Sequence, residues 1–388
     1  MKKELPPIIF FTHGYIATED AFMKMSDLLV SNYADAFFEA PFLNLNGLLL
    51  SEEKTFTSIK AGKEIEHNIN NVVELSLANP TKAILCRLRL CGATGSSDVN
   101  LQVSRLRYLI EQLVPFLHDK RPFVLIGHSQ GGLVNLLATT YLDGIIDQVI
   151  SISTPYRDVQ SIKETLVLAK LSKKSIAILE HFASFTFGKV SQTTLEELLQ
   201  GVFIFGDNKL TNLIKDRFKE MENRPRLDVI CGVAGIFNGS VFNWRRAYDG
   251  LVTVSEQQDI DYDERHIFSE VSLPCLEDNR KLINASTRCL NCSECKLPEF
   301  NFRYILKDLR NKVSVDDLTF DIINSGFQAI KHLPIPKEKE DSATYKIFYE
   351  TFDTLYNHQN ILFQPEVADK IVEILVKQDL LSLKKNGE

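Results

Sequence analysis

Residues 122–138 read PFVLIGHSQGGLVNLLA, an apolar run that enters a glycine-rich turn and leaves through a second apolar segment. The run Phe123–Ile126 is typical of a buried strand, and Gly131–Tyr141 has the apolar spacing of a helix. Between them, Gly-x-Ser-x-Gly at 127–131 places one serine at the sharpest point of the turn. Such a turn is so tight that the residues two before and two after the serine must lack side chains. The arrangement predicts that Ser129 is a nucleophile at the N-terminus of a helix, whose dipole favours developing negative charge.

Strand-like and helix-like segments alternate through the first part of the chain. The alternation favours a parallel sheet joined by crossover helices. We therefore predict an α/β fold with a mostly parallel central sheet and flanking helices. The predicted strands are 8–11, 83–90, 123–126 and 148–153, and the predicted helices are 21–33, 101–117 and 131–141.

The rest of the chain predicts one core interrupted by two insertions. The core would comprise residues 1–155, 226–255 and 346–388. Its second part would contain a strand at 227–231 and the acid loop, and its third part a final helix at 365–377. Residues 156–225 would form a helical lid or cap, and 256–345 a second insertion that carries a cysteine cluster. Phenylalanines gather in the first insertion. They would either bury an acyl chain under the lid or only pack the insertion onto the core. They are Phe182, Phe185, Phe187, Phe203 and Phe205.

Composition narrows the class of protein. The 388 residues are 44% hydrophobic and 24% charged, values that exclude disordered and fibrous chains. The formal net charge of −7 comes from 51 acidic and 44 basic residues that are well mixed, so we expect no nucleic-acid partner. The apolar run Ile8–Phe11 is far shorter than the core of an export signal, and no stretch reaches the roughly 18 apolar residues of a membrane span. We predict a cytoplasmic protein whose lid makes at most transient contact with a membrane surface.

A serine of this kind requires a general base, and His358 is the predicted one. It lies in the loop LYNHQNILF, which leads into the final helix. In the chain order Ser–acid–His that accompanies this turn, the base comes last. His128 adjoins the serine, and its side chain is expected to point away from the hydroxyl. The other histidines lie in helical, surface-like or irregular sequence.

The acid that orients the base should follow a late strand. Asp249 in RAYDGLVTV meets this requirement, and Asp158 in STPYRD is the alternative. Asp353 is too close to the histidine in sequence. The acid would hold the imidazole in the correct tautomer and stabilise the imidazolium.

The reaction also requires two N–H donors for an oxyanion. One should be the backbone N–H of Gln130, directly after the serine. The loop THGY at 12–15 should supply the other, and there we predict the N–H of Tyr15, because Gly14 allows a close backbone approach. His13 is expected to brace this loop by hydrogen bonding.

The cysteines raise the question of a metal. Four of them lie near one another in the second insertion and are candidate ligands of a structural Zn²⁺, although their spacing is not that of paired CxxC motifs. Free or redox-active surface cysteines are the alternative. The four are Cys275, Cys289, Cys292 and Cys295, whereas Cys86, Cys91 and Cys231 are predicted core thiols. We expect no other cofactor.

Together these motifs resemble the successive landmarks of α/β-hydrolase lipases. The segments that carry the resemblance are FFTHGY, VLIGHSQGG, VISISTPYRD, YDGLVTVSEQQ and NHQNILFQPEVADKIVEIL. The resemblance implies hydrolysis of a carboxylic ester, of a lipid or acyl substrate, through an acyl-enzyme with Ser129, Asp249 and His358 as the triad. Asp249 and His358 are 109 positions apart (358 − 249), and neither insertion matches a pattern of the family. A thioesterase or amidase would use the same residues, and a hydrolase-fold binding protein without turnover is the alternative from another class.

Overall fold

A computed structural model of the chain describes the core that carries the predicted turn. The described residues are 3–14, 19–46, 48, 59–90, 99–156, 209–232, 235–238, 245–248, 252, 256–257, 265–269, 299–301, 358 and 360–383. Most of the predicted lid and most of the predicted second insertion lie outside these ranges.

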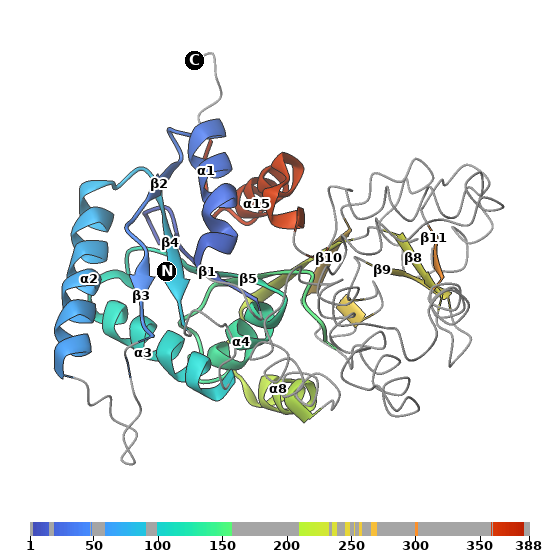
Figure 1. Ribbon diagram of the computed structural model, residues 1–388. Helices are drawn as coiled ribbons and strands as arrows, with labels where there is room; N and C mark the ends of the chain where they lie inside the picture. Colours follow the sequence, from blue (N-terminus) through green and yellow to red (C-terminus); the bar gives the residue numbers. More distant parts are fainter. Residues whose placement is uncertain are drawn as a thin grey trace, which may run out of the picture.

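A parallel sheet forms the centre of the described core (Figure 1). Within the described residues it has eight strands, seven of them in the order β10-β7-β6-β5-β1-β4-β2, with β3 pairing with β4. Every pair of neighbours in this sheet is parallel. The strands are β1 Ile8–Thr12, β2 Phe37–Glu39, β3 Leu43–Asn44, β4 Ala83–Arg89, β5 Phe123–His128, β6 Gln148–Ile152, β7 Arg226–Cys231 and β10 Arg265–Ser269. A smaller sheet contains β8 Gly235–Asn238, β9 Arg245–Tyr248 and β11 Glu299–Asn301.

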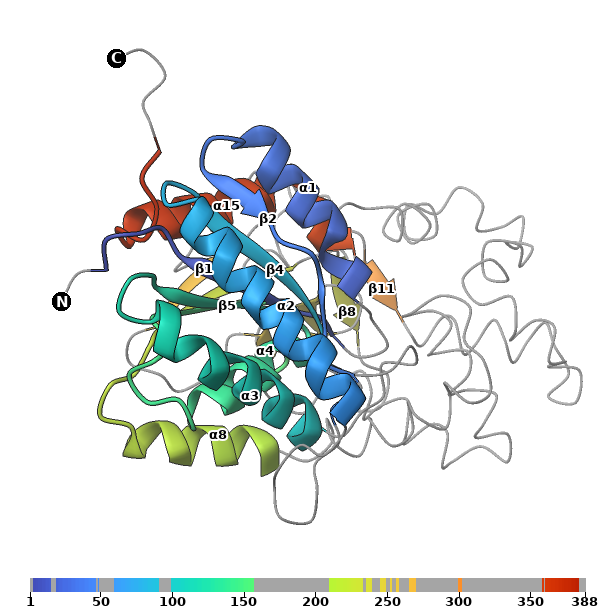
Figure 2. The ribbon, with the colours of Figure 1, turned by 90° about the vertical axis from the view of Figure 1, so that its left-hand side faces the viewer.

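Helices cover both faces of the main sheet (Figures 1 and 2). One face packs against α2 Ile59–Ala78, α3 Val99–Leu117, α4 Gln130–Thr139 and α8 Lys209–Glu220. The other packs against α1 Met23–Asn32 and α15 Pro365–Lys377, preceded by the short 3-10 helices η1 Glu19–Phe22 and η4 Asn360–Phe363. Strands covered on both faces are buried along their whole length and mostly apolar, as β1 and β5 are. The predicted α/β class, with a mostly parallel sheet and flanking helices, is confirmed.

Two elements of this core fall inside segments that the sequence assigned to insertions. Helix α8 belongs to the predicted lid, yet its Ile214 and Phe218 are buried in the core cluster that also contains α4. It therefore serves as a crossover helix between β6 and β7. Strand β10 belongs to the predicted second insertion, and it extends the main sheet by pairing with β7. The core thus continues into both predicted insertions, whose other residues lie mainly outside the described ranges.

A buried arginine binds the backbone just before β1 and just before β4. Arg121 is fully buried and donates to the backbone carbonyl oxygens of Pro6 (2.7 Å), Lys82 (2.9 Å), Ser76 (2.6 Å) and Asn79 (2.7 Å). The last two carbonyls come from the C-terminal end of α2 and the residue after it, where helix carbonyls lack partners within the helix. Burial lowers the pKa of the Arg121 guanidinium to about 10, so it stays charged at neutral pH.

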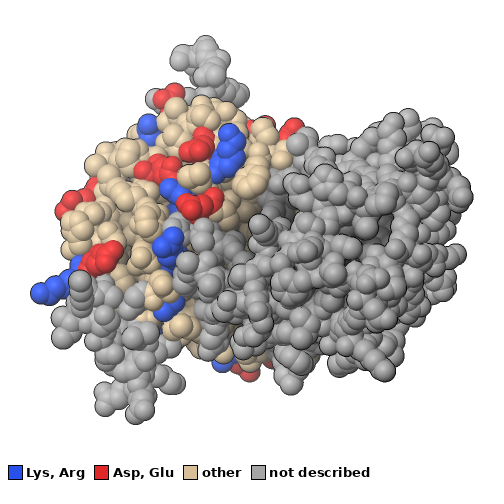
Figure 3. All heavy atoms as spheres, in the orientation of Figure 1, with Lys and Arg blue, Asp and Glu red and all other residues tan. Residues whose placement is uncertain are grey.

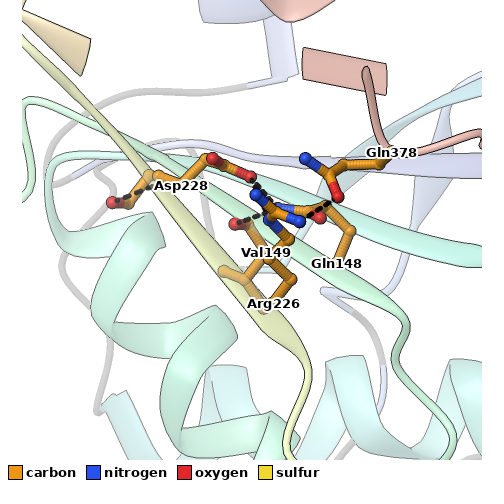
Figure 4. Close-up of polar contacts among 6 residues, drawn as sticks. Gln148, Val149, Arg226, Asp228 and Gln378 are labelled. Carbon is orange, nitrogen blue, oxygen red and sulfur yellow. Dashed lines mark hydrogen bonds and ion pairs between the residues drawn. The ribbon is translucent and has the colours of Figure 1, made fainter. Parts of the chain in front are cut away.

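A buried carboxyl group lies between β6 and β7 (Figure 4). Asp228 on β7 accepts a hydrogen bond from the Gln148 side chain at the start of β6. The Nε of Arg226 lies 4.0 Å from its carboxylate, and the same arginine donates to Gln378 after α15. Burial raises the pKa of Asp228 to about 6, although the charge of Arg226 acts in the opposite direction.

The described surface mixes charges of both signs. On the face that Figure 3 shows, lysine and arginine side chains alternate with aspartate and glutamate over the described part of the chain. Among the helices of the described part, none combines the length and the apolar character that crossing a membrane requires.

Candidate active site

The turn at 127–131 connects β5 to α4 and has a strained backbone. Ser129 adopts φ 54° and ψ −126°, a region in which a residue with a β-carbon costs about 1–3 kcal/mol. A β-carbon added to Gly127 would lie 2.6 Å from the backbone carbonyl of Gly131, and one added to Gly131 would lie 2.1 Å from the carbonyl oxygen of Thr12. The predicted need for glycine on both sides of the serine is therefore confirmed by close packing.

Hydrogen bonds fix this turn to its neighbours. The N–H of Ser129 donates to the carbonyl oxygen of Ile152 at the end of β6 (2.9 Å), and Thr12 Oγ1 at the end of β1 donates to Asn135 Oδ1 on α4 (2.7 Å). The backbone N–H of Ser129 is thus already used. The N–H of Gln130 belongs to the first turn of α4, where amides have no partner within the helix. It is the predicted oxyanion donor.

The loop after β1 approaches the serine closely. A β-carbon on Gly14 would lie 2.8 Å from Cβ of Ser129. The buried His13 donates from Nδ1 to the carbonyl oxygen of Gly14 (3.0 Å), which agrees with the expected bracing of this loop. Tyr15, the predicted second donor, follows directly but lies outside the described residues.

The structure brings the predicted base to the predicted nucleophile. Nε2 of His358 lies 2.9 Å from Oγ of Ser129, although the two residues are 229 positions apart. His358 is 4% exposed and Ser129 is 6% exposed, so bulk water has little access to this contact. Ile361 and Leu362 in η4 are buried against α1 and α15 and anchor the segment that follows the histidine. The geometry allows the serine hydroxyl to donate its proton to the imidazole.

A second histidine contacts the base, which the sequence did not predict. Nε2 of His128 donates to the backbone carbonyl oxygen of His358 at 2.5 Å, and the centroids of the two rings are 4.9 Å apart. Burial, followed by the nearby His358, holds the pKa of His128 well below its usual value. The sequence predicted only that this side chain points away from the hydroxyl, with no role of its own. No local signal could have revealed a contact across 230 positions.

Several predicted site residues lie outside the described part of the chain. These are Tyr15, Asp249, its alternative Asp158, and the candidate zinc ligands Cys275, Cys289, Cys292 and Cys295. Their roles stay predictions. Among the residues that the structure does describe, no three His, Cys, Asp or Glu side chains are grouped so as to hold a metal ion. Cys86 and Cys231 are buried in β4 and β7, as expected of core thiols, and burial raises the pKa of Cys86 to about 12.

The arrangement defines a class of protein by its architecture. A serine in a strained turn after a central parallel strand, with a histidine beyond the last strand of the sheet, is the layout of the α/β-hydrolase fold. No protein-family model matches the sequence, and no curated protein matches it.

The similar solved structures include lipases and esterases. A lipase-esterase related protein from Clostridium acetobutylicum is 13% identical, with 75% of this chain and 96% of that chain covered and a TM-score of 0.32. The mature form of the Bacillus licheniformis lipase BlEst2 is 12% identical, with 74% and 91% covered and a TM-score of 0.37. A monoacylglycerol lipase from Paleococcus ferrophilus is 10% identical, with 69% and 86% covered and a TM-score of 0.32. With TM-scores below 0.5, these likenesses carry no argument about this chain.

Proposed function

We propose that the protein is a serine hydrolase that cleaves carboxylic esters of a lipid or acyl substrate through an acyl-enzyme on Ser129. The observation that carries the proposal is the 2.9 Å contact between Oγ of Ser129 and Nε2 of His358, buried at the N-terminus of α4. A serine hydroxyl is a weak nucleophile unless a neighbouring base takes its proton. The contact supplies such a base, and the strained turn holds the hydroxyl in front of it.

In the first half-reaction, Oγ of Ser129 attacks the ester carbonyl carbon while its proton passes to Nε2 of His358. The carbonyl oxygen becomes an oxyanion, which the N–H groups of Gln130 and Tyr15 would stabilise. The bond to the alcohol then breaks, and the imidazolium returns the proton to the leaving alcohol. The product is an acyl ester on Ser129.

In the second half-reaction, His358 takes a proton from water as the water oxygen attacks the acyl carbon. Collapse of the second tetrahedral intermediate returns this proton to Oγ of Ser129 and releases a carboxylic acid. Asp249 would accept a hydrogen bond from the other ring nitrogen of His358 and stabilise the imidazolium. This acid is part of the proposal and rests on the sequence.

The substrate class also rests on the sequence. Phenylalanines in the predicted lid favour an acyl chain as the ligand, and the lid would exclude water from the acyl-enzyme. A thioester or amide would enter the same chemistry, because only the leaving group differs. A cytoplasmic location is also part of this proposal, and it too rests on the sequence alone.

Labelling with a fluorophosphonate and turnover of p-nitrophenyl esters test the proposal. We expect covalent labelling at Ser129 in the wild type and none in Ser129→Ala. His358→Gln should lower kcat/KM by about 10²–10⁴-fold, the usual contribution of a general base. Ser153→Ala is the matched control, since Ser153 is also a buried serine at positive φ (49°) but follows the neighbouring strand β6.

A folded wild-type protein that neither reacts with the probe nor turns over any ester would refute the proposal. Labelling that persists in Ser129→Ala would refute the choice of nucleophile. Comparison of kcat/KM for ester, thioester and amide substrates with one acyl group identifies the preferred leaving group. A series of p-nitrophenyl esters of increasing chain length then tests the acyl-chain assignment.

A further inference from the structure

The side chain beside the nucleophile connects it to the loop that carries the base. His128 is the last residue of β5 and is 4% exposed. Its Nε2 lies 2.5 Å from the backbone carbonyl oxygen of His358. The ring of His358 in turn contacts Ser129. The imidazole of His128 and the hydroxyl of Ser129 therefore both contact His358, which lies 230 and 229 positions further along the chain.

The chemistry of this contact assigns the tautomer of His128. A carbonyl oxygen only accepts hydrogen bonds, so Nε2 must carry the hydrogen. Nδ1 is buried and makes no hydrogen bond with the residues that the structure describes. A neutral ring with its one N–H on Nε2 agrees with the surroundings of both ring nitrogens. Burial favours this neutral form by lowering the pKa of His128. The ring is therefore a fixed donor toward the base loop.

The ring also has little room to move. A β-carbon on Gly14 would lie 3.2 Å from Nδ1 of His128, so the loop after β1 packs against the side of the ring opposite its donor. On the donor side, its centroid is 4.9 Å from that of the His358 ring. His128 thus lies between the loop expected to supply an oxyanion donor and the loop that carries the base.

We propose that His128 is a positioning residue, whose Nε2–H binds the carbonyl oxygen of His358 and thereby holds the base at hydrogen-bonding distance from Ser129. The inference rests on the proposed function, because it gives the contact a consequence for the reaction. The segment after His358 is anchored by η4 and α15, and the hydrogen bond from His128 fixes the backbone of the residue that carries the ring. A displacement of about 1 Å at a reacting group can cost about 10²-fold in rate.

Two replacements separate the hydrogen bond from packing. His128→Leu fills a similar volume without a donor, and His128→Gln keeps an amide N–H that extends about as far as Nε2 does. We expect kcat of His128→Leu to fall by about 10–100-fold with KM changed less than about 2-fold, because the base is displaced while substrate binding is not. His128→Gln should recover most of the loss. His67→Gln, at an exposed position on α2, is the matched control and should match the wild type.

Hydrogen–deuterium exchange provides a readout that does not depend on activity. In His128→Leu the backbone amides of residues 360–363 should exchange faster than in the wild type, and in His128→Gln they should exchange at nearly the wild-type rate. Far-UV circular dichroism and the thermal midpoint show whether each variant is folded under the assay conditions. Should His128→Leu fail to fold, the same comparison is made with His128→Gln and with His128→Asn, whose amide is too short to reach the carbonyl.

The results distinguish this inference from the proposed function. If the wild type turns over esters and the donor-free variant keeps its kcat within about 2-fold and its exchange rates unchanged, the positioning role is wrong. A uniform loss of thermal stability without a change in kcat would also overturn it, since a packing role alone would have that effect. If the wild type is inert but exchange at 360–363 rises in the donor-free variant, the contact holds the loop and the proposed function is wrong.

Discussion

Replacing Ser129 by glycine and by alanine separates the strain of the turn from its chemistry. Both variants lose the hydroxyl, so neither should turn over substrate. They differ only in the β-carbon, which at φ 54° and ψ −126° is the source of the strain. Alanine keeps that β-carbon and should keep the strain, whereas glycine should release it.

The expected difference follows from two opposing contributions. Release of the strain is worth about 1–3 kcal/mol. Glycine also gains about 0.5–1 kcal/mol of conformational freedom in the unfolded chain, which disfavours folding. Little packing is lost, since the β-carbon is a single methylene-sized group beside Gly14. We therefore expect Ser129→Gly to have a free energy of unfolding about 0–2.5 kcal/mol larger than that of Ser129→Ala.

Urea unfolding followed by far-UV circular dichroism measures this difference at a single pH. Ser26 provides the control, because it is a buried serine inside helix α1. There the order should reverse, with Ser26→Gly less stable than Ser26→Ala by about 1 kcal/mol, the usual helix penalty of glycine. If glycine is also the less stable replacement at position 129, the strain assigned to the turn is wrong.

Two further predictions concern the buried polar groups of the core. Arg121→Ala should lower the free energy of unfolding by on the order of 4 kcal/mol, because four buried or partly buried backbone carbonyls lose a charged donor, and urea unfolding measures the loss. Asp228 should make stability depend on pH. Its pKa is about 6 in the folded protein and about 3.9 in an unfolded chain, so the folded state holds the proton to higher pH. Its contribution to stability is therefore present below pH 4 and is lost as pH rises to 6, a change of about 3 kcal/mol relative to Asp228→Asn.

Each of these predictions has its own control. Arg107→Ala removes an exposed arginine that pairs with Glu111 on α3, and it should cost less than about 1 kcal/mol. An Arg121→Ala variant no less stable than Arg107→Ala would contradict the role assigned to the buried guanidinium. For Asp228, unfolding of the wild type and Asp228→Asn is measured from pH 4 to pH 7. A difference between them that stays constant over this range would show that the carboxyl group does not titrate there.

The sequence predicted the turn and the elements around it well, for local reasons. Glycine at 127 and 131 is a steric requirement that can be read within five residues, and the structure has backbone atoms within 2.6 Å of both missing β-carbons. The final helix was predicted at 365–377 and has those bounds, because Pro365 marks its first turn and its apolar residues share one face. Strong local signals of this kind need no tertiary information.

The elements that the sequence missed depend on partners far along the chain. Strand β10 is the short segment RHIFS within a part of the sequence that has no clear apolar pattern, and it is a strand because β7 offers a parallel edge. Helix α8 was recognised as helical sequence but not as a core helix, since its Phe218 finds its partners only after folding. The contact of His128 with His358 has the same origin. Of the predicted triad, the order of residues along the chain was enough to pair Ser129 with His358, whereas Asp249 lies outside the described residues.

The separation of nucleophile and base along the chain has a consequence for synthesis on the ribosome. The proposed base is made 229 residues after the serine, which takes about 10–45 s at common rates of translation. During that interval β1, β4, β5 and α4 are all available to form the strained turn, but the proposed proton acceptor does not yet exist. A nascent chain would therefore carry a shaped but unreactive serine. Reactivity would appear only when the segment that begins at His358 docks against α1. Until then, esters near the ribosome could not acylate Ser129 of the growing chain.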